Sequence, residues 1–216
     1  MIPKLEPISK KAVIIADGDF PQHEIPLRYL RESEFIICCD GSARYLADAG
    51  MTPSVIVGDM DSLSEELKER FADRLYVDSE QESNDLTKSV RWCLNAGYDD
   101  LVILGATGKR EDHSVGNISL LAEYIKIVNV KMVTDTGIFI PFVKSCTVDS
   151  APGQQVSVFS IDPSTRITSY GLLYPLKNRN LNNWWEGTLN EATGDYFKLD
   201  FDGGIMIVFL AFKTDK

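Results

Sequence analysis

Residues 53–62 read PSVIVGDMDS, an apolar run that ends in a glycine and two aspartates. The run is rich in β-branched residues and lacks polar alternation, which is typical of a strand buried on both faces of a parallel sheet. Asp59 and Asp61 stand two positions apart, so in extended chain their carboxylates point the same way. The stretch therefore predicts a buried strand that carries two acidic groups to one end of a sheet.

Comparable apolar runs recur through the first 135 residues. They are 12–16 (AVIIA), 35–39 (FIICC), 74–77 (RLYV), 101–104 (LVIL) and 130–133 (VKMV). Amphipathic segments separate them, and we expect helices at about 24–32, 42–49, 64–72, 84–96 and 112–126. Alternation of strands and helices implies right-handed βαβ units. We therefore predict an α/β domain over residues 1–135 with a mostly parallel, six-stranded sheet.

The pattern changes after Asp135. The later segments have strand character and are separated by turn signals such as Pro152-Gly153, with no helical period. These segments are 137–144, 145–149, 155–161 and 205–212. We therefore predict a small antiparallel β domain over residues 136–216.

Composition narrows the class of protein. The chain is 44% hydrophobic and 25% charged, which is ordinary for a globular protein. No apolar run approaches the roughly 20 residues that span a bilayer, and the run at 12–16 is too short for the core of a signal peptide. We expect a cytoplasmic protein without a membrane partner. The net charge is −10 and the basic residues do not cluster, which argues against a nucleic-acid partner.

The four cysteines do not form a metal-finger or redox motif. Cys38 and Cys39 are adjacent, and no C-x-x-C spacing occurs with Cys93 or Cys146. We expect buried free thiols.

Acidic groups follow the predicted strands. Ligands of open α/β sheets bind beyond the carboxyl ends of the strands, and those ends carry Asp17-Gly18-Asp19, Asp40-Gly41-Ser42, the Asp59–Asp61 pair and, after residue 77, Asp78 and Asp85. So many carboxylates at one rim would repel one another without cations. Mg²⁺ commonly binds one or two carboxylates together with substrate phosphate oxygens. The alternative is that the aspartates only cap helices and form turns.

A glycine-containing segment, Gly105–Lys109, follows the fifth predicted strand. It is neither a Walker A sequence nor a dinucleotide fingerprint, but its glycines permit close backbone approach. The helix from about Asp112 offers its N-terminus to an anion, and Arg110 and His113 would add positive charge. A helix cap and a surface imidazole are the alternatives for Asp112 and His113.

Two smaller features have both structural and functional explanations. Asp85 and Lys88 are three apart at a helix start, so they form either a local ion pair or a metal ligand beside a phosphate contact. In the second domain, Tyr174 and the pair Trp184-Trp185 are either core and interface residues or a surface for a cationic aromatic ligand.

The order of these blocks resembles the thiamin pyrophosphokinase family over nearly the whole chain. The blocks are Asp17-Gly18-Asp19, Cys39–Ser42, Pro53–Ser62, Asn84–Lys88, Gly105–His113, Gly171–Leu176 and Gly187–Glu191. The resemblance implies a Rossmann-like ATP-binding domain followed by a β-sandwich, in a homodimer with sites between subunits. It also implies transfer of the diphosphoryl group of ATP to thiamin, which yields thiamin diphosphate and AMP.

The resemblance implies roles for individual residues. Asp40, Asp59, Asp61 and Asp85 would be catalytic and hold Mg²⁺. ATP would contact Asp17, Gly18, Asp19, Gly41, Lys88, Gly105, Thr107, Gly108, Arg110, Asp112 and His113. Thiamin would contact Gln81, Tyr174, Trp184, Trp185 and Asn190. The chain departs from the family pattern at Leu189, where Ser usually precedes Asn, and at Asn84, where Thr is common.

Two other functions are compatible with parts of the sequence. A metal-dependent phosphohydrolase would use Asp17 or Asp19 as a nucleophile after the first strand, but it would leave the Asp59 and Asp112-His113 blocks unexplained. A non-catalytic module that senses thiamin diphosphate or a nucleotide would account for Leu189, but not for four acidic groups kept at one rim.

Overall fold

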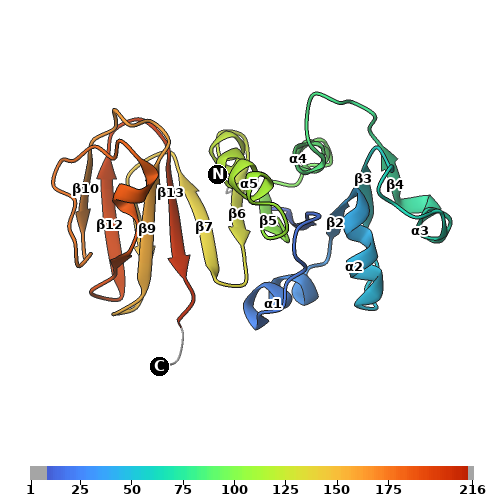
Figure 1. The fold of residues 1–216 in the computed structure, drawn as a ribbon, viewed down its shortest axis with the longest axis horizontal. Helices are drawn as coiled ribbons and strands as arrows, with labels where there is room; N and C mark the ends of the chain where they lie inside the picture. Colours follow the sequence, from blue (N-terminus) through green and yellow to red (C-terminus); the bar gives the residue numbers. More distant parts are fainter. Residues whose placement is uncertain (1–8, 214–216) are drawn as a thin grey trace, which may run out of the picture. The chain divides into compact units, whose positions relative to one another are not determined.

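The computed structural model describes residues 9–213, and the chain divides into two compact units, Met1–Arg110 and Glu111–Lys216. The first unit contains a parallel sheet with the strand order β5-β1-β2-β3-β4 (Figure 1). Its strands are β1 (Lys11–Ile15), β2 (Ile36–Cys39), β3 (Val55–Gly58), β4 (Leu75–Val77) and β5 (Asp100–Leu104). Ile14, Ile37, Ile56 and Ile103 are fully buried, because helices cover a parallel sheet on both faces.

The helices of this unit begin close to the predicted positions. They are α1 (Glu24–Glu32), α2 (Ala43–Asp48), α3 (Glu65–Arg70) and α4 (Asp85–Asn95), with a 3₁₀ turn, η1, at Asp40–Ser42. The side chain of Asn84 accepts a hydrogen bond from the backbone N–H of Thr87 at 2.9 Å and so caps α4. This cap fixes Asp85 as the first residue of the helix.

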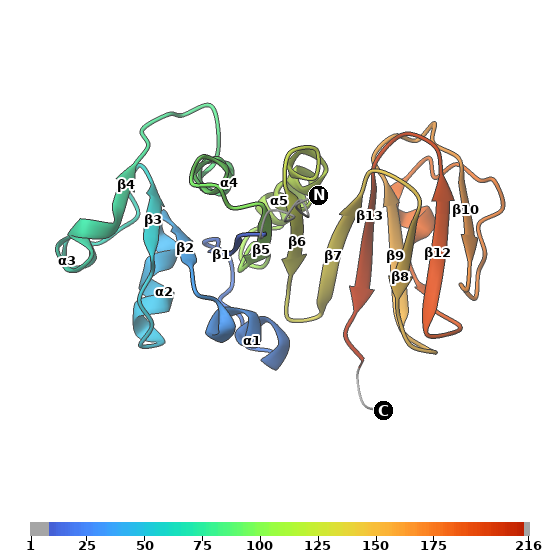
Figure 2. The same ribbon diagram turned by 180° about the vertical axis from the view of Figure 1, so that it is seen from behind.

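The second unit begins with α5 (Glu111–Tyr124) and continues with strands. The strand order is β11-β9-β13-β7-β6, and every pairing among these strands is antiparallel. Their bounds are β6 (Asn129–Val133), β7 (Gly137–Phe142), β9 (Gln155–Ser160), β11 (Asn190–Glu191) and β13 (Met206–Ala211). Figure 2 shows this unit from the other side.

A small antiparallel sheet completes the second unit, with the order β10-β12-β8. Its strands are β10 (Ile167–Tyr170), β12 (Tyr196–Phe201) and β8 (Cys146–Asp149). Buried side chains of both sheets form one apolar cluster that includes Val156, Val158, Phe197, Leu199 and Val208. The expected sheet-on-sheet packing is therefore present in this unit.

The predicted six-stranded, mostly parallel sheet needs correction. Within residues 9–213 the first unit contains five parallel strands, and β6, which belongs to the second unit, pairs with β7 in the antiparallel sense. The three residues between β6 and β7 permit a hairpin but are far too few for a parallel crossover. Thr134 closes the turn, since its backbone N–H donates to Gly137 O at 2.9 Å.

Three strands of the second unit were not predicted from the sequence. In β12, buried Phe197, Leu199 and Phe201 alternate with more exposed residues, which is the ordinary strand pattern. Strand β11 has only two residues, which is too short for a pattern of alternating hydrophobicity. No helix among residues 9–213 is long and apolar enough to cross a membrane.

Candidate active site

The backbone brings Asp40 against the end of β3. Strands β2 and β3 are parallel neighbours, so Asp40, which follows β2, lies beside Gly58. A Cβ atom placed on Gly58 would be 2.7 Å from Cβ of Asp40, and only glycine leaves room for this approach. Asp40 itself has φ of +35°, a conformation that is costly for a residue other than glycine.

Asp40, Asp59 and Asp61 form a compact acidic group. One carboxylate oxygen from each lies within 4.8 Å of the others, a spacing that suits a shared cation. Asp40 is only 2% exposed. Its Oδ2 accepts a hydrogen bond from the Ser62 N–H at 3.1 Å, while its buried Oδ1 accepts none from any residue in the described range 9–213. An unsatisfied buried carboxylate oxygen is unfavourable unless a cation meets it, so the donor set fits Mg²⁺.

The pKa values of the acidic group reflect these surroundings. The pKa of Asp40 is raised to about 6, mainly by burial and also by the negative charges of Asp85, Asp61 and Asp59, while the hydrogen bond from Ser62 opposes the rise. Hydrogen bonds from Gln81 and from the Asp61 backbone lower the pKa of Asp59. Asp59 is therefore the more readily ionised of these two carboxylates.

Asp59 and Asp61 meet through a turn and not through the extended chain that the sequence predicted. Met60 between them has φ of +68°, and the Asp61 N–H donates to Asp59 Oδ1 at 3.3 Å. Gln81 Nε2 donates to Asp59 Oδ2 at 3.2 Å, and Ser62 Oγ donates to Asp61 Oδ1 at 2.9 Å. The turn and its neighbours hold both carboxylates beside Asp40.

Asp85 and Lys88 lie next to this acidic group. Lys88 is only 3% exposed, and its Nζ donates to Asp85 Oδ1 at 3.2 Å. Burial raises the pKa of Asp85 in spite of this ion pair. Asp85 Oδ1 would be 3.3 Å from a Cβ atom on Gly58, so it faces the same backbone as Asp40. Asp85 is outside the group of three whose oxygens lie within 4.8 Å.

The loops after β1 and β5 bond to one another. The Gly18 N–H donates to Gly105 O at 2.7 Å, and the Asp19 N–H donates to Thr107 O at 2.9 Å. A Cβ atom on Gly18 would be 2.5 Å from Gly105 O, and one on Gly108 would clash with the Asp19 carboxylate. Several residues predicted to contact ATP thus lie in two loops that are joined by backbone hydrogen bonds, and Gly41 follows Asp40 in η1.

Two cations at these loops were not singled out from the sequence. Arg44 Nη2 and Lys109 Nζ both donate to Asp17 Oδ1, at 3.0 and 3.1 Å. Both lie over the ring of Tyr45, at 4.6 and 4.9 Å from its centroid. The only feature of the sequence that could have indicated these two residues is their closeness to predicted ATP contacts. Arg44 is three residues after Gly41, and Lys109 follows Gly108.

Arg110, Asp112 and His113 lie on both sides of the division between the compact units. Asp112 and His113 are in the first turn of α5, where Asp112 Oδ1 accepts a hydrogen bond from the His113 N–H at 2.9 Å. Their contact with ATP stays a prediction.

In the second unit, Asn190 holds the chain at Tyr174. Its Oδ1 accepts hydrogen bonds from the N–H groups of Tyr174 and Glu191, at 3.0 and 2.9 Å, and its Nδ2 donates to Tyr174 O at 2.8 Å. The amide of Asn190 therefore positions the backbone of Tyr174, a residue that is 65% exposed. Gln81, predicted for the thiamin side, lies in the first unit against Asp59.

The two tryptophans differ in their surroundings. Both belong to a 3₁₀ turn, η3 (Trp184–Gly187). The ring of Trp184 packs on Phe159 with centroids 5.6 Å apart, whereas Trp185 is 72% exposed. Trp185 is therefore the ring that is available for a planar ligand.

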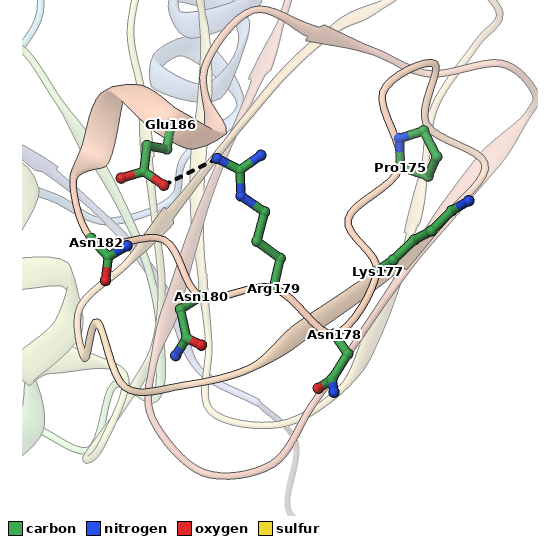
Figure 3. Close-up of a pocket in the computed structure, with 7 residues that line it drawn as sticks. All are labelled: Pro175, Lys177, Asn178, Arg179, Asn180, Asn182 and Glu186. Atoms are coloured by element: carbon green, nitrogen blue, oxygen red, sulfur yellow. Dashed lines mark hydrogen bonds and ion pairs between the residues drawn. The ribbon is translucent and has the colours of Figure 1, made fainter.

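A polar hollow of about 580 Å³ lies beside η3 (Figure 3). None of the predicted site residues lines it. Its lining residues are Pro175, Lys177, Asn178, Arg179, Asn180, Asn182 and Glu186. Arg179 forms an ion pair with Glu186 at 3.2 Å across it, as the dashed line in Figure 3 marks.

Two family models match the chain in succession. The catalytic domain of thiamin pyrophosphokinase matches residues 27–134, and the substrate-binding domain of thiamin pyrophosphokinase matches residues 137–209. The chain belongs to the thiamin pyrophosphokinase family. The resemblance noted in the sequence is thereby confirmed.

Named members of the thiamin pyrophosphokinase family align with parts of the chain. Thiamine pyrophosphokinase of Bacillus subtilis is 36% identical over 125 residues, which cover 55% of this chain and 57% of that protein. Thiamine pyrophosphokinase 1 of rice is 29% identical over 202 residues, which cover 79% of this chain and 75% of that protein. The match with the bacterial protein thus spans little more than half of its length.

Solved structures share the fold. The crystal structure of thiamine pyrophosphokinase from Bacillus subtilis superposes with a TM-score of 0.81 at 24% identity, and the alignment covers 95% of this chain and all of that one. Thiamin pyrophosphokinase from Candida albicans gives a TM-score of 0.79 at 19% identity, over 95% of this chain and 90% of that one. At these identities the likeness establishes the fold.

The acidic group and the exposed aromatic residues fall in stretches that are matched by different thiamin pyrophosphokinase domain models. The acidic group, Asp85 and Gln81 lie in the stretch matched by the catalytic domain. Tyr174, η3 and Asn190 lie in the stretch matched by the substrate-binding domain.

Proposed function

We propose that this protein transfers the diphosphoryl group of ATP to the hydroxyl of thiamin, forming thiamin diphosphate and AMP. The observation that carries the proposal is the acidic group around Asp40, with its unsatisfied buried oxygen, in a chain of the thiamin pyrophosphokinase family. The names of the relatives from Bacillus subtilis and rice support the same activity. In this reaction the thiamin oxygen bonds to the β-phosphorus, the bond from that phosphorus to the α-phosphate oxygen breaks, and the hydroxyl proton is released.

The residues present fit Mg²⁺ as the cofactor. Asp40, Asp59 and Asp61 would hold it, with Asp85 beside them. The chemistry that Mg²⁺ supplies when bound is neutralisation of charge on the phosphate oxygens. Gln81 and the Asp61 backbone N–H orient Asp59, and the Ser62 N–H orients Asp40. Phosphoryl-type transfer depends on such positioning more than on covalent help from the protein.

The substrates fit the two parts of the chain. We assign ATP to the loops at Asp17–Asp19 and Gly105–Gly108, with Arg110, Asp112 and His113, and thiamin to the exposed rings of Trp185 and Tyr174. A cationic thiazolium ring is attracted to the face of an aromatic side chain. We propose a functional boundary between these parts near residue 135, and the two stretches that the family models match, 27–134 and 137–209, support it.

A product analysis tests the proposal. Purified protein is mixed with thiamin, ATP and Mg²⁺, and AMP, ADP and thiamin diphosphate are quantified. We expect AMP and thiamin diphosphate in equal amounts, with the loss of both in Asp59→Asn. Asp73→Asn is the matched control, because Asp73 is an exposed aspartate whose carboxylate pairs only with Arg74 among the described residues at 3.8 Å.

Other product patterns would favour other functions. ADP with thiamin monophosphate would make this an ordinary kinase. Phosphate release without dependence on thiamin would favour a hydrolase, and saturable thiamin diphosphate binding without turnover would favour a sensing module.

The assembly and location are part of the proposal. We propose a cytoplasmic homodimer, on the resemblance to the family. Light scattering of the purified protein should give twice the mass of one chain, and a mass of one chain would contradict the homodimer.

A further inference from the structure

Arg44 and Lys109 share a single carboxylate. Arg44 Nη2 lies 3.0 Å from Asp17 Oδ1, and Lys109 Nζ lies 3.1 Å from the same atom and 2.7 Å from the Asp17 carbonyl oxygen. All three side chains are partly exposed. Two positively charged side chains thus share the single carboxylate of Asp17.

The backbone at Lys109 is held in an unusual conformation. Its φ of +53° is the left-handed region, which is unfavourable for lysine and favourable for glycine. In this conformation Lys109 Nζ donates two hydrogen bonds to Asp17, one to its carbonyl oxygen and one to its carboxylate. The ammonium group also lies over the ring of Tyr45. Residues in such conformations cluster at functional sites.

Arg44 reaches toward the acidic group. Its Nη1 would lie 3.5 Å from a Cβ atom on Gly41, the residue after Asp40. Nη2 donates to Asp17 and to the Tyr45 hydroxyl, whereas Nη1 and Nε donate to no protein atom within residues 9–213. The planar guanidinium therefore has one side free for a bidentate contact with an oxyanion.

We propose that Arg44 and Lys109 form the binding site for the phosphate of the nucleoside monophosphate, which is the α-phosphate of ATP and the phosphate of the product AMP. The inference rests on the proposed function. The carboxylates of Asp40, Asp59 and Asp61 would repel the phosphate of AMP when Mg²⁺ does not accompany it. Positively charged side chains of the protein would offset this repulsion. Asp17 orients both side chains, and the Tyr45 ring supports them from one side.

Binding of AMP and of adenosine in EDTA isolates this contact from the metal site. Arg44→Gln and Lys109→Gly are compared with wild type by calorimetry. Lys109→Gly suits the left-handed backbone, so the loss of the cation is separated from misfolding, which a thermal melt checks. Arg31→Gln is the matched control, because it removes a cation that pairs with Glu24 at 3.0 Å.

We expect each variant to weaken AMP binding about tenfold, which is the scale of one charge-assisted hydrogen bond, and to leave adenosine binding within about twofold. Unchanged AMP binding in both folded variants would overturn the proposal, as would an equal loss for AMP and adenosine. The result is independent of turnover. If wild type forms no thiamin diphosphate, the proposed function fails, while the difference between AMP and adenosine still decides the phosphate site.

Discussion

At the scale of single residues, Asp40 combines features that are each unfavourable in the metal-free protein. It has a left-handed backbone, it is buried, and one of its oxygens lacks a hydrogen bond from the described residues. Natural sequences keep such a residue where function needs it. The same features predict how the stability of the metal-free protein depends on this carboxylate.

We expect Asp40→Asn to stabilise the metal-free protein at pH 7.5. The pKa of Asp40 is about 6 in the folded state, above its ordinary 3.8, so the folded state binds more protons between these values. Stability therefore falls as pH rises from about 4 to 6, and the full penalty remains above 6. Asparagine removes a penalty of roughly 1–3 kcal/mol. Urea unfolding in EDTA at pH 7.5 and pH 4 measures it, and the gain should be several-fold smaller at pH 4.

An exposed aspartate provides the control for this pH dependence. Asp73→Asn should shift neither midpoint, because Asp73 is exposed. A loss of stability in Asp40→Asn at pH 7.5 would contradict the assigned penalty.

Addition of Mg²⁺ should reverse the same penalty. At a concentration about 100-fold above its dissociation constant, a ligand that binds only the folded state adds about 2.7 kcal/mol to the stability. We expect a higher melting temperature for wild type with Mg²⁺ and a much smaller rise for Asp59→Asn. Equal rises in both proteins would remove Asp59 from the metal site.

At the scale of elements, the site is held by contacts between loops. The loop after β1 and the loop after β5 exchange backbone hydrogen bonds, and glycines permit the close approach. The turn at Met60 similarly places Asp59 and Asp61 without an extended chain. The strands therefore bring the acidic residues to the carboxyl-terminal edge of the sheet, and the loops that follow the strands fix the positions of the side chains.

Gly18→Ala tests the loop contact. Its Cβ would be 2.5 Å from Gly105 O and closer still to Thr107 O, so one loop must move, and we expect a loss of roughly 2–4 kcal/mol. Gly116→Ala in α5 is the matched control. Its Cβ meets nothing within 4 Å, and alanine in a helix should add about 0.5–1 kcal/mol. Thermal melts of both variants distinguish these signs, and a neutral Gly18→Ala would contradict the packing.

At the scale of the whole molecule, we propose that the two parts of the chain bind different substrates. The acidic group belongs to the stretch matched by the catalytic domain, and the exposed aromatic rings belong to the stretch matched by the substrate-binding domain. Changes in one part should therefore affect one substrate more than the other.

Trp185→Ala measures this division. We expect the KM for thiamin to rise about tenfold, the scale of a partly desolvated cation–π contact, with no change in the affinity for ATP with Mg²⁺. Steady-state kinetics and nucleotide titration provide the two values. Trp184→Ala is the comparison, and it should lower stability instead, because that ring packs on Phe159. A rise in both constants for Trp185→Ala would contradict the assignment.

The sequence alone determined β1 to β6, the five α-helices to within a few residues and the acidic residues at the strand ends, because hydrophobic periodicity and caps are local signals. It also carried the family resemblance. It did not predict β11, which has two residues, or the antiparallel pairing of β6, which depends on a short turn. It misjudged how Asp59 and Asp61 meet, because the backbone at Met60 is left-handed.

Only the tertiary structure decided which groups lie together. Asp17 and Lys109 are 92 residues apart in sequence yet hydrogen-bonded, and Gln81 reaches Asp59 across 22 residues. Asp40 lies beside Gly58 because β2 and β3 are parallel neighbours, and its buried Oδ1 has no hydrogen bond from the described residues. Local patterns fix where a chain extends or coils, whereas burial, charge balance and hydrogen-bond partners depend on segments that meet only when the chain is folded.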